Sequence, residues 1–354
     1  MDNKQYTIKD IAQMAGVSAG TVDRVIHSRG EVSASSREKV ERILQEINYQ
    51  PNMYAIGLAR KKKYHFGCFM PKYEPNDYWH SVAKGIGKAM DEVAPFNISL
   101  DYIFYDHSNK VSYVAAGKRM LSKEFDAVLI APNYTEETLE ITAKLQERGI
   151  PFVFIDVNVE DAGALGYIGQ DSFRSGNITA RIMHAMGLRG DEVALFHSES
   201  DTNSLEIQMQ HRLEGFNAYL EEEHIHIILH DVELKKDPDE TRHILEELFV
   251  KYPGIKAGVV FNSRIYRVGE FLKESGVPVK ILAGYDLLPR NVALLKEGMV
   301  SFLIGQRPSM QGYAGIKMLT DKVVFKRDVP QRCYMPVDIL IKENIDYYVE
   351  SYNL

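Results

Sequence analysis

Cysteine and long apolar segments are scarce in this sequence. Its 354 residues include only two cysteines, Cys68 and Cys333, which lie far apart and form no CxxC pair. Neither a disulfide framework nor a zinc site is therefore indicated. No run of eighteen or more apolar residues occurs, and no apolar segment near the N-terminus is followed by a small-residue cleavage site. We accordingly expect a cytoplasmic protein without a membrane span or an export signal.

Charge is unevenly distributed along the chain. With 45% hydrophobic and 26% charged residues, the composition is ordinary for a globular protein of two or three domains. Residues 1–63 hold eleven Lys or Arg against seven Asp or Glu, a net +4, whereas the remainder holds 31 against 42, a net −11. Only the first segment suits a DNA partner. The run Arg60–Lys63 at its end is either a screen for phosphates or a solvated linker.

The first segment begins with two short helices. Apolar residues one helical turn apart predict a helix after Thr7, with Asp10 completing a capping box, and Gly16 is its expected left-handed stop. Ser18 is the expected N-cap of a second helix, whose apolar face starts at Val22. Two helices joined by so short a turn are typical of a helix-turn-helix, whose second helix enters the major groove. An ordinary helical hairpin is the alternative.

A third helix closes this small unit. Ser33 is its expected N-cap, and Val40 and Ile43 lie on its apolar face. Pro51 ends the bundle, because the residue before a proline is displaced from helical geometry. A helix over 53–60 follows, too short to be stable by itself. The sequence thus predicts a helical head over 1–50 and a conditional hinge over 51–63.

The residues of this head resemble the LacI/GalR family of repressors. The matching segments are Thr7–Ala12, Ala15–Ser18, Thr21–Val22, Arg24–Val25, Arg37–Val40, and Asn48–Asn52 with Leu58–Ala59. The resemblance implies DNA contacts from Thr7, Ser18, Ala19, Gly20, Thr21, Asp23, Arg24, His27, Asn52, Leu58 and Ala59. It also implies that the hinge becomes helical only on DNA and wedges Leu58 into the minor groove, where an apolar side chain bends the duplex. Packing of Leu58 on the rest of the chain is the alternative.

Two positions of the second helix bear on specificity. Arg24 can pair bidentately with guanine, whereas Ala19 and Gly20 offer no polar group and permit close approach. Asp23 departs from the family pattern, which usually carries Ser there. It either accepts a hydrogen bond from cytosine or pairs locally with Arg24 or His27, and both interpretations stay open.

From residue 64 onward, short apolar runs alternate with amphipathic segments. The predicted strands are 65–70, 98–105, 127–131, 151–156, 192–197, 225–230, 257–261, 280–285 and 300–305, and the predicted helices include 79–94, 111–123, one from about 172, and 205–223. This alternation predicts an α/β fold with two doubly wound parallel-sheet lobes, with ligands at the carboxyl ends of the strands. Polar residues at those ends, among them Asp106, Asn133 and Asp171, are ligand contacts or helix N-caps.

Residues 64–354 resemble the type I periplasmic sugar-binding fold that this repressor family carries as its effector domain. The resemblance rests on Tyr78-Trp79, Phe154–Val157, Arg212–Phe216, Phe261-Asn262, Gly284–Asp286 and Ile304–Pro308. It implies an effector cleft lined by Tyr78, Trp79, Asp156, Arg212, Asn262, Asp286 and Gln306. It also implies crossings between the lobes near 169, 302 and 334, so that one lobe comprises about 64–168 and 305–333 and the other about 169–302 and 334–354.

The side chains expected in this cleft suit a polyol. Carboxylates and amides bind paired hydroxyls, Arg212 can hold a ring oxygen or an acid group, and Trp79 can cover the apolar face of a sugar. Trp79 as an ordinary core residue is the alternative. Elsewhere, His224, His226 and His230 would share one face of a strand; a metal site and the polar edge of a strand are the two interpretations, and we predict no metal or other cofactor.

Together these features predict a transcriptional regulator rather than an enzyme. We expect a repressor whose affinity for double-stranded operator DNA is set by a sugar-like effector, acting as a homodimer or higher oligomer on a pseudo-palindromic site. Neither a GxSxG elbow nor a GxGxxG turn follows a predicted strand, and P-loop and HExxH motifs are missing. The alternatives are a sugar-processing enzyme and a solute-binding protein with an accessory helical head.

Overall fold

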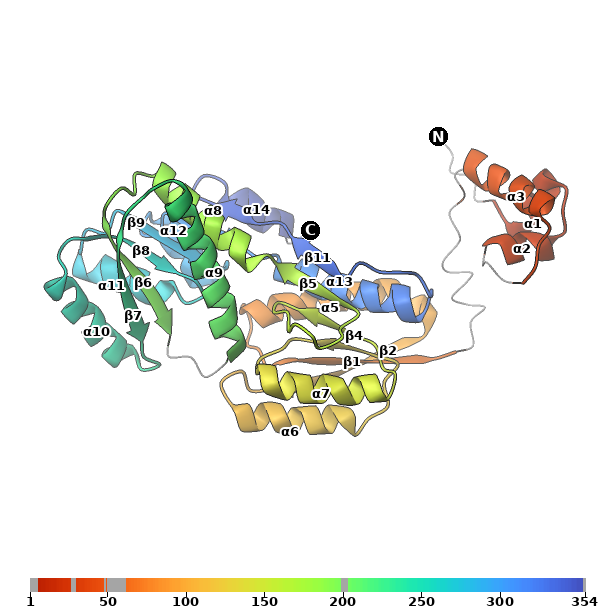
Figure 1. Cartoon of the computed structure of the whole chain (residues 1–354), viewed down its shortest axis with the longest axis horizontal. Coiled ribbons are helices and arrows are strands. Elements are labelled where there is room, and N and C mark those ends of the chain that lie inside the picture. The colour runs from red at the N-terminus through yellow and green to blue at the C-terminus, as the bar shows by residue number, and fades with distance from the viewer. Residues whose placement is uncertain (1–5, 27–29, 48, 50–61, 199–202, 353–354) are drawn as a thin grey trace. The chain divides into compact units, whose positions relative to one another are not determined.

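The computed structural model describes residues 6–26, 30–47, 49, 62–198 and 203–352, and the chain divides into two compact units, residues 1–61 and 62–354 (Figure 1). The predicted hinge helix over 53–60 lies outside the described residues. Both cysteines are free, Cys68 in the core and Cys333 half-buried. None of the described helices is long and apolar enough to cross a membrane.

The described part of the smaller unit folds as three helices, α1 (Ile8–Ala15), α2 (Ala19–Ile26) and α3 (Ala34–Glu46). The predicted capping box is present, because Thr7 Oγ1 accepts a hydrogen bond from the Asp10 amide and the Asp10 carboxylate accepts one from the Thr7 amide. Gly16 stops α1 with a φ of 66°. The core contains Ile11, Ala12, Ala15, Val22, Val25, Val40 and Ile43. The three helices predicted for the head are confirmed.

The larger unit is built on two six-stranded sheets. The first sheet is parallel throughout, in the order β11 (Arg332–Met335), β5 (Gly166–Gln170), β4 (Phe152–Ile155), β3 (Ala127–Ile130), β1 (Tyr64–Pro71) and β2 (Ile98–Tyr105). Helices α6 (Lys110–Leu121) and α7 (Thr135–Glu147) cover one face, and α5 (Tyr78–Val93) and α13 (Pro308–Val323) cover the other (Figure 1). The short 3-10 helix η1 (Ala94–Phe96) follows α5. We call this part lobe 1.

The second sheet has the order β12 (Asp338–Leu340), β10 (Phe302–Gly305), β9 (Ile281–Tyr285), β8 (Ile255–Val260), β6 (Glu192–Ser198) and β7 (Ile228–Leu234). β12 is antiparallel to β10, and the other neighbours are parallel. Helices α8 (Ser172–Ala185) and α9 (Asn203–Glu222) pack on one face; α10 (Pro238–Lys251), α11 (Tyr266–Ser275), α12 (Pro289–Lys296) and α14 (Ile345–Tyr352) pack on the other. We call this part lobe 2. The predicted fold class, a helical head followed by two doubly wound lobes, is confirmed.

Glycine lets one pair of helices in each lobe approach closely. A Cβ atom on Gly85 of α5 would lie 1.7 Å from the carbonyl oxygen of Ser309 in α13. A Cβ atom on Gly176 of α8 would lie 1.8 Å from the carbonyl oxygen of Arg212 in α9. Because no side chain tolerates such distances, both helix pairs depend on the missing Cβ.

Three segments carry the chain from one sheet to the other. They lie between β5 and α8, between β10 and α13, and between β11 and β12, close to the crossings predicted near 169, 302 and 334. Gln170 is 2% exposed, and its Nε2 donates hydrogen bonds to the carbonyl oxygens of Gly305 at 3.0 Å and Pro336 at 3.3 Å. One side chain therefore joins all three crossing segments.

The prediction of a strand over 225–230 is wrong, because β7 starts at Ile228 and runs to Leu234. His224 has a φ of 54°, and the amide of Ile225 donates a hydrogen bond to Leu220. These residues close the end of α9 instead of starting a strand. The side chains of Ile225 and Ile227 still pack on the core, which explains the apolar alternation in the sequence.

Candidate functional site

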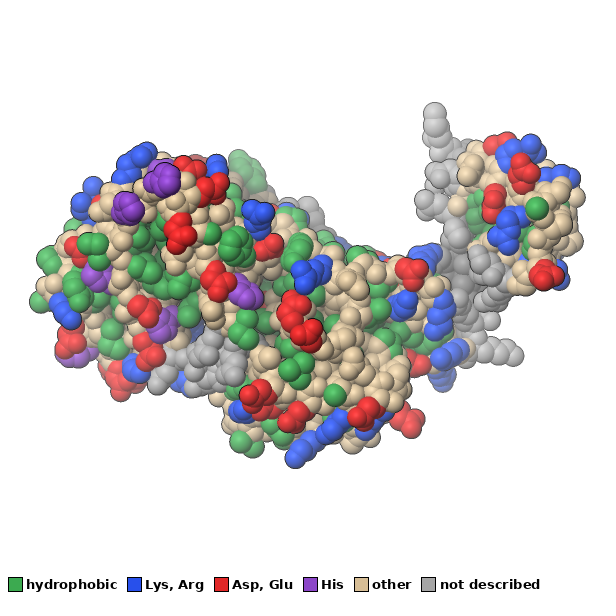
Figure 2. Space-filling model, in the orientation of Figure 1, with side chains coloured by type: hydrophobic (Ala, Val, Ile, Leu, Met, Phe, Trp, Pro, Cys, Tyr) green, Lys and Arg blue, Asp and Glu red, His purple; other side chains and the backbone are tan. Residues whose placement is uncertain are grey.

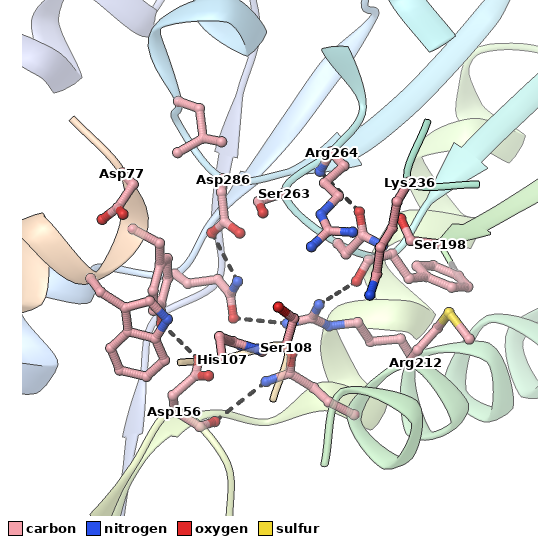
Figure 3. A pocket seen from close by; sticks show the side chains of 18 of the residues that line it. Asp77, His107, Ser108, Asp156, Ser198, Arg212, Lys236, Ser263, Arg264 and Asp286 are labelled. Atoms are coloured by element: carbon pink, nitrogen blue, oxygen red, sulfur yellow. Dashed lines mark hydrogen bonds between the residues drawn. The ribbon is translucent and has the colours of Figure 1, made fainter. Parts of the chain in front are cut away.

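A cavity of about 300 Å³ lies between the two lobes, at the carboxyl ends of their strands (Figure 3). Lobe 1 contributes residues after β1, β2 and β4 and at the start of α5, and lobe 2 contributes residues after β6, β7, β8, β9 and β10 and along α9. All seven residues predicted for the effector cleft line this cavity: Tyr78, Trp79, Asp156, Arg212, Asn262, Asp286 and Gln306. Their roles in binding stay a prediction.

Asp156 is held at the end of β4 in a left-handed conformation, with a φ of 69°. Its carboxylate accepts a hydrogen bond from the Tyr78 hydroxyl at 2.8 Å, and its amide donates one to Gln311 Oε1 at 3.0 Å. Burial raises the pKa of Asp156, opposed by the hydrogen bond from Tyr78 and the charge of Arg212. The carboxylate is therefore less acidic than a solvated one.

Asp286 occupies the corresponding place after β9, with a φ of 68°. Its Oδ1 accepts a hydrogen bond from Gln306 Nε2 at 2.8 Å, and Asn291 Nδ2 donates to its carbonyl oxygen at 3.1 Å. Burial raises the pKa of Asp286 to about 7, although the hydrogen bond from Gln306 works in the opposite direction. Near neutral pH this group is thus a mixture of carboxylic acid and carboxylate.

Arg212 lies between these groups and is only 1% exposed. Its guanidinium donates to the carbonyl oxygen of Phe261 and, at 2.8 Å, to Gln306 Oε1, and it stacks 4.0 Å from the centre of the Tyr285 ring. Its Nε has no hydrogen-bond partner in the structure. A chain of hydrogen bonds therefore runs from Arg212 through Gln306 to Asp286.

Trp79 and Asn262 complete the predicted set. Trp79 is 9% exposed, lines the cavity and packs edge-on against Tyr78, with 5.2 Å between ring centres. It is thus both largely buried and part of the cavity wall. Asn262 Oδ1 accepts a hydrogen bond from the amide of Arg264 at 2.9 Å, which shapes the turn after β8.

Other polar residues at strand ends support the backbone and do not line this cavity. Asp171 caps α8 through the amide of Arg174, Asp106 accepts from the amide of Ser108, and Asn133 donates to the carbonyl oxygen of His107. The N-cap alternative therefore holds for Asp171.

Sequence reasoning missed several members of the site. Lys72, His107, Ser108, Gln208, Lys236, Ser263 and Arg264 also line the cavity. Gln311 lies in the first turns of α13, fully buried, and donates hydrogen bonds to the Tyr78 hydroxyl and the Gln306 carbonyl oxygen. Lys236 and Arg264 closely follow strands, and the same position after a strand was the signal that led to Asp156. Nothing in the sequence distinguishes Gln311 from other residues of an amphipathic helix.

In the head, α2 presents an exposed face opposite its buried residues Val22 and Val25. Of the predicted DNA contacts, Thr7, Ser18, Ala19, Gly20 and Arg24 are exposed, and Thr21 and Asp23 are half-buried. Ser18 Oγ accepts a hydrogen bond from the Thr21 amide at 3.1 Å and therefore caps α2 as predicted. His27, Asn52, Leu58 and Ala59 lie outside the described residues.

The basic run before lobe 1 is partly described. Lys62 forms an ion pair with Asp126 at 3.3 Å and lies 4.7 Å from the centre of the Tyr64 ring, whereas Arg60 and Lys61 lie outside the described residues. On the face of the larger unit shown in Figure 2, acidic and basic side chains of the described residues are interspersed.

The histidines considered as metal ligands are separated by the shift of β7. His230 Nε2 contacts Glu192 Oε2 at 2.7 Å and packs on the Tyr252 ring, whereas His224 and His226 lie in the connection before the strand. Within the described ranges, no group of three His, Cys, Asp or Glu side chains is arranged to hold a metal ion.

Comparison with known proteins adds the family. Residues 7–52 match the family described as bacterial regulatory proteins, lacI family, and residues 66–327 match the periplasmic binding protein domain. A solved LacI transcriptional regulator from Bacteroides fragilis is 38% identical, with a TM-score of 0.76, over 81% of this chain and 100% of that one. The chain belongs to the LacI family. The family and fold predicted from the sequence are therefore confirmed.

Among curated relatives, this LacI-family chain is 26% identical over 217 residues to the HTH-type transcriptional regulator DegA of Bacillus subtilis, covering 61% of each protein. It is 29% identical over 157 residues to catabolite control protein A of Staphylococcus aureus, covering 44% of this chain and 45% of that one. The chain thus spans about half to three fifths of these relatives. The structure of GanP, a glucose-galactose binding protein of Geobacillus stearothermophilus, shares the fold at 21% identity, with a TM-score of 0.70 over 80% of this chain and 99% of GanP.

Proposed function

We propose that this LacI-family chain is a sequence-specific transcriptional repressor whose affinity for operator DNA is controlled by a small sugar-like ligand in the cavity between the lobes. The proposal rests on the combination, in one chain, of a capped helix-turn-helix with an exposed second helix and an α/β unit with a buried polar cavity. Its DNA partner assigns it to the cytoplasm. The relatives named above are regulators or binding proteins, which favours this function over catalysis.

For DNA reading, the proposal assigns α2 to the major groove. Arg24 is exposed on this helix and has the fork of donors that pairs with guanine. Ala19 and Gly20 precede it on the exposed face and let the backbone approach the bases. Leu58 in the hinge is the proposed minor-groove wedge, and the hinge transmits the state of the lobes to the head.

For the effector, the proposal assigns the cavity wall to a polyol. Asp156, Asp286 and Asn262 offer acceptors for paired hydroxyl groups, and Trp79 offers an aromatic face for the ring carbons. The volume of about 300 Å³ is at the lower end of the range for small-molecule sites. GanP, which shares this fold, is by its name a glucose-galactose binding protein.

We further propose a homodimer. β2 is an edge strand, and its Tyr102 is 37% exposed and stacks on Phe104 with 5.3 Å between ring centres. Tyr73 extends this group, because its ring packs edge-on against Phe104 and stacks on His80. An exposed aromatic surface at a sheet edge suits a second copy of the chain, and two heads match a pseudo-palindromic operator. Light scattering of the purified chain tests this, and a monomer at micromolar concentration would contradict it.

The decisive test is selection of DNA from a random library by the purified full chain, followed by fluorescence anisotropy. We expect a pseudo-palindromic consensus and an affinity for it that changes when the effector is added. Arg24→Ala should weaken binding to the consensus by about 1–3 kcal/mol and leave random DNA unaffected. Lys62→Ala is the control: Lys62 pairs with Asp126 in lobe 1, so any phosphate contact it makes on DNA does not depend on base sequence, and its loss should weaken all sequences alike. Enrichment of no consensus would overturn the proposed function.

A further inference from the structure

The cavity buries a positive charge whose hydrogen-bond partners are neutral. Arg212 is 1% exposed and donates to a carbonyl oxygen and an amide oxygen, stacks on an aromatic ring, and leaves its Nε unsatisfied. No ion pair joins it to a carboxylate within the described part of the chain. A buried guanidinium without a carboxylate partner is unfavourable until an anion reaches it.

Two further cations share this part of the cavity. Figure 3 shows the side chains of Arg264 and Lys236 extending toward the guanidinium of Arg212, with Asp286 and Asp156 on the other side. Arg264 follows β8 and Lys236 follows β7, two strands of lobe 2 that flank β6, and both side chains line the cavity at the carboxyl ends of these strands. Three of the lining cations, Arg212, Lys236 and Arg264, therefore come from lobe 2, whereas Trp79 and the carboxylate of Asp156 come from lobe 1.

The carboxylates on the acidic side of the cavity do not bond directly to Arg212. Its hydrogen bonds go to the carbonyl oxygen of Phe261 and to Gln306, and its charge acts on Asp156 and Asp286 only from a distance. Gln306 stands between Arg212 and Asp286 and bonds to both. Among the described residues, Lys72, Lys236 and Arg264 line the cavity together with Arg212, and the carboxylates of Asp77, Asp156 and Asp286 line it as well.

We propose that the effector is an anionic sugar derivative, a polyol that carries a phosphate or carboxylate group. Its hydroxyl groups face Asp156, Asp286 and Asn262, its ring carbons face Trp79, and its anionic group is bound by Arg212, Lys236 and Arg264. Arginine and lysine donors toward an anion form stronger hydrogen bonds than neutral pairs do. This inference rests on the proposed function and narrows its ligand from sugars in general to charged ones.

Calorimetry with matched sets of ligands tests the inference on the full chain. Each set holds a neutral sugar, its phosphate and its sugar acid: glucose, glucose 6-phosphate and gluconate; ribose, ribose 5-phosphate and ribonate; galactose, galactose 6-phosphate and galacturonate. We expect one anionic member to bind at least about tenfold more tightly than its neutral parent, the gain given by a charge-assisted hydrogen bond. Inorganic phosphate alone should bind weakly, because it leaves the polyol side empty.

Variants then locate the anionic group. Lys236→Gln and Arg264→Gln should each lower the affinity for the anionic ligand by about tenfold and leave the affinity for its neutral parent unchanged. Lys280→Gln is the matched control, because Lys280 is an exposed cation of lobe 2 that does not line the cavity, and it should change neither. Thermal unfolding of each variant verifies that the lobes remain folded.

The possible results separate this inference from the proposed function. Neutral sugars that bind as tightly as their anionic partners, with no effect of Lys236→Gln or Arg264→Gln, would overturn the inference and leave a sugar-controlled regulator. Inorganic phosphate that binds as tightly as the sugar phosphate would show that the hydroxyl groups add no affinity, and would overturn the part of the inference that makes the ligand a polyol. A protein that binds its DNA consensus but no member of any set would overturn both this inference and the sugar-like effector.

Discussion

The two lobes place an aspartate at the same point of the fold and surround it differently. Asp156 follows β4 and Asp286 follows β9, with φ values of 69° and 68°. The amide of each donates a hydrogen bond to the neighbouring strand, to Ile168 at 3.0 Å and to Ile304 at 2.9 Å. Both lobes therefore use one backbone arrangement to turn a carboxylate into the cavity, although the left-handed conformation is unusual for a residue other than glycine.

The surroundings of the two carboxylates differ. Asp156 accepts from the phenol of Tyr78, beside the indole of Trp79, whereas Asp286 accepts from Gln306, which also bonds to Arg212. Around its aspartate, lobe 1 thus presents aromatic and hydroxyl groups, whereas lobe 2 presents an amide and a guanidinium. The shared backbone sets where a ligand binds, and the neighbouring side chains set which ligand it is.

The largest effect on stability is expected at the close helix pairs, where the two lobes are most alike. Gly85→Ala and Gly176→Ala each place a Cβ atom less than 2 Å from a carbonyl oxygen, so each should lower the free energy of unfolding by about 3 kcal/mol. Gly87→Ala is the control, because nothing lies within 4 Å of its Cβ position, and it should be neutral or slightly stabilising. Chemical denaturation measures all three. Equal stability of Gly176→Ala and Gly87→Ala would show that the α8 and α9 contact is looser than described.

The second effect is on the pH dependence of the free energy of unfolding, and it isolates the contribution of Asp286. In the folded state the pKa of Asp286 is about 7, whereas its ordinary value is 3.8. Between these values the folded state binds more protons than the unfolded chain, so raising the pH through this window lowers the free energy of unfolding, by about 1 kcal/mol per pH unit. Asp286→Asn should remove this part of the slope. Denaturation of wild type and variant at pH 5, 6 and 7 measures the difference, and parallel profiles would contradict the raised pKa.

The third effect tests the amide bridge of lobe 2. Gln306→Ala leaves Arg212 and Asp286 without their shared partner, so effector affinity should fall at least about tenfold, while affinity for operator DNA without effector should stay near the wild-type value. Gln210→Ala, on the exposed side of α9, is the matched control. Calorimetry and anisotropy give the two quantities. Retention of effector binding in Gln306→Ala would place the ligand elsewhere.

The smallest effect is expected from the corresponding bond of lobe 1. Tyr78→Phe removes the hydroxyl that Asp156 and Gln311 share and keeps the ring, so stability should fall by about 1 kcal/mol, and effector affinity should fall less than in Gln306→Ala. The two variants are compared in the same calorimetric titration. A loss as large as that of Gln306→Ala would remove the distinction between the lobes.

The sequence sufficed to predict one class of site residue. Asp156, Asp286, Asn262 and Gln306 follow apolar runs, and the geometry of doubly wound sheets brings the ends of such runs to one edge. Tyr78, Trp79 and Arg212 were reached only through the family resemblance, because they lie on helices, where periodicity describes a buried face and not a cavity.

Other features could not be predicted from local patterns. Gln311 contacts Tyr78 and Asp156, which lie far away in sequence, as well as the nearby Gln306, and no spacing rule encodes the two long-range contacts. Lys236 and Arg264 look like solvated loop residues until the strands place them together. The start of β7 was missed because His224 adopts a left-handed conformation that is uncommon for residues other than glycine, and an apolar alternation in a connection resembles that of a strand.

Gln170 has a mechanical consequence for the larger unit. Because its amide holds the chain near Gly305 and Pro336 as well as at its own strand, the three passages between the lobes are pinned at one point. Sliding one lobe along the other would stretch these buried bonds together, whereas a swing about that point would leave them nearly unchanged. The Gln170 amide therefore favours a hinge rotation of one lobe relative to the other over a sliding movement. A small rotation caused by a ligand in the cavity therefore becomes a larger displacement at the parts of the lobes that lie farthest from Gln170.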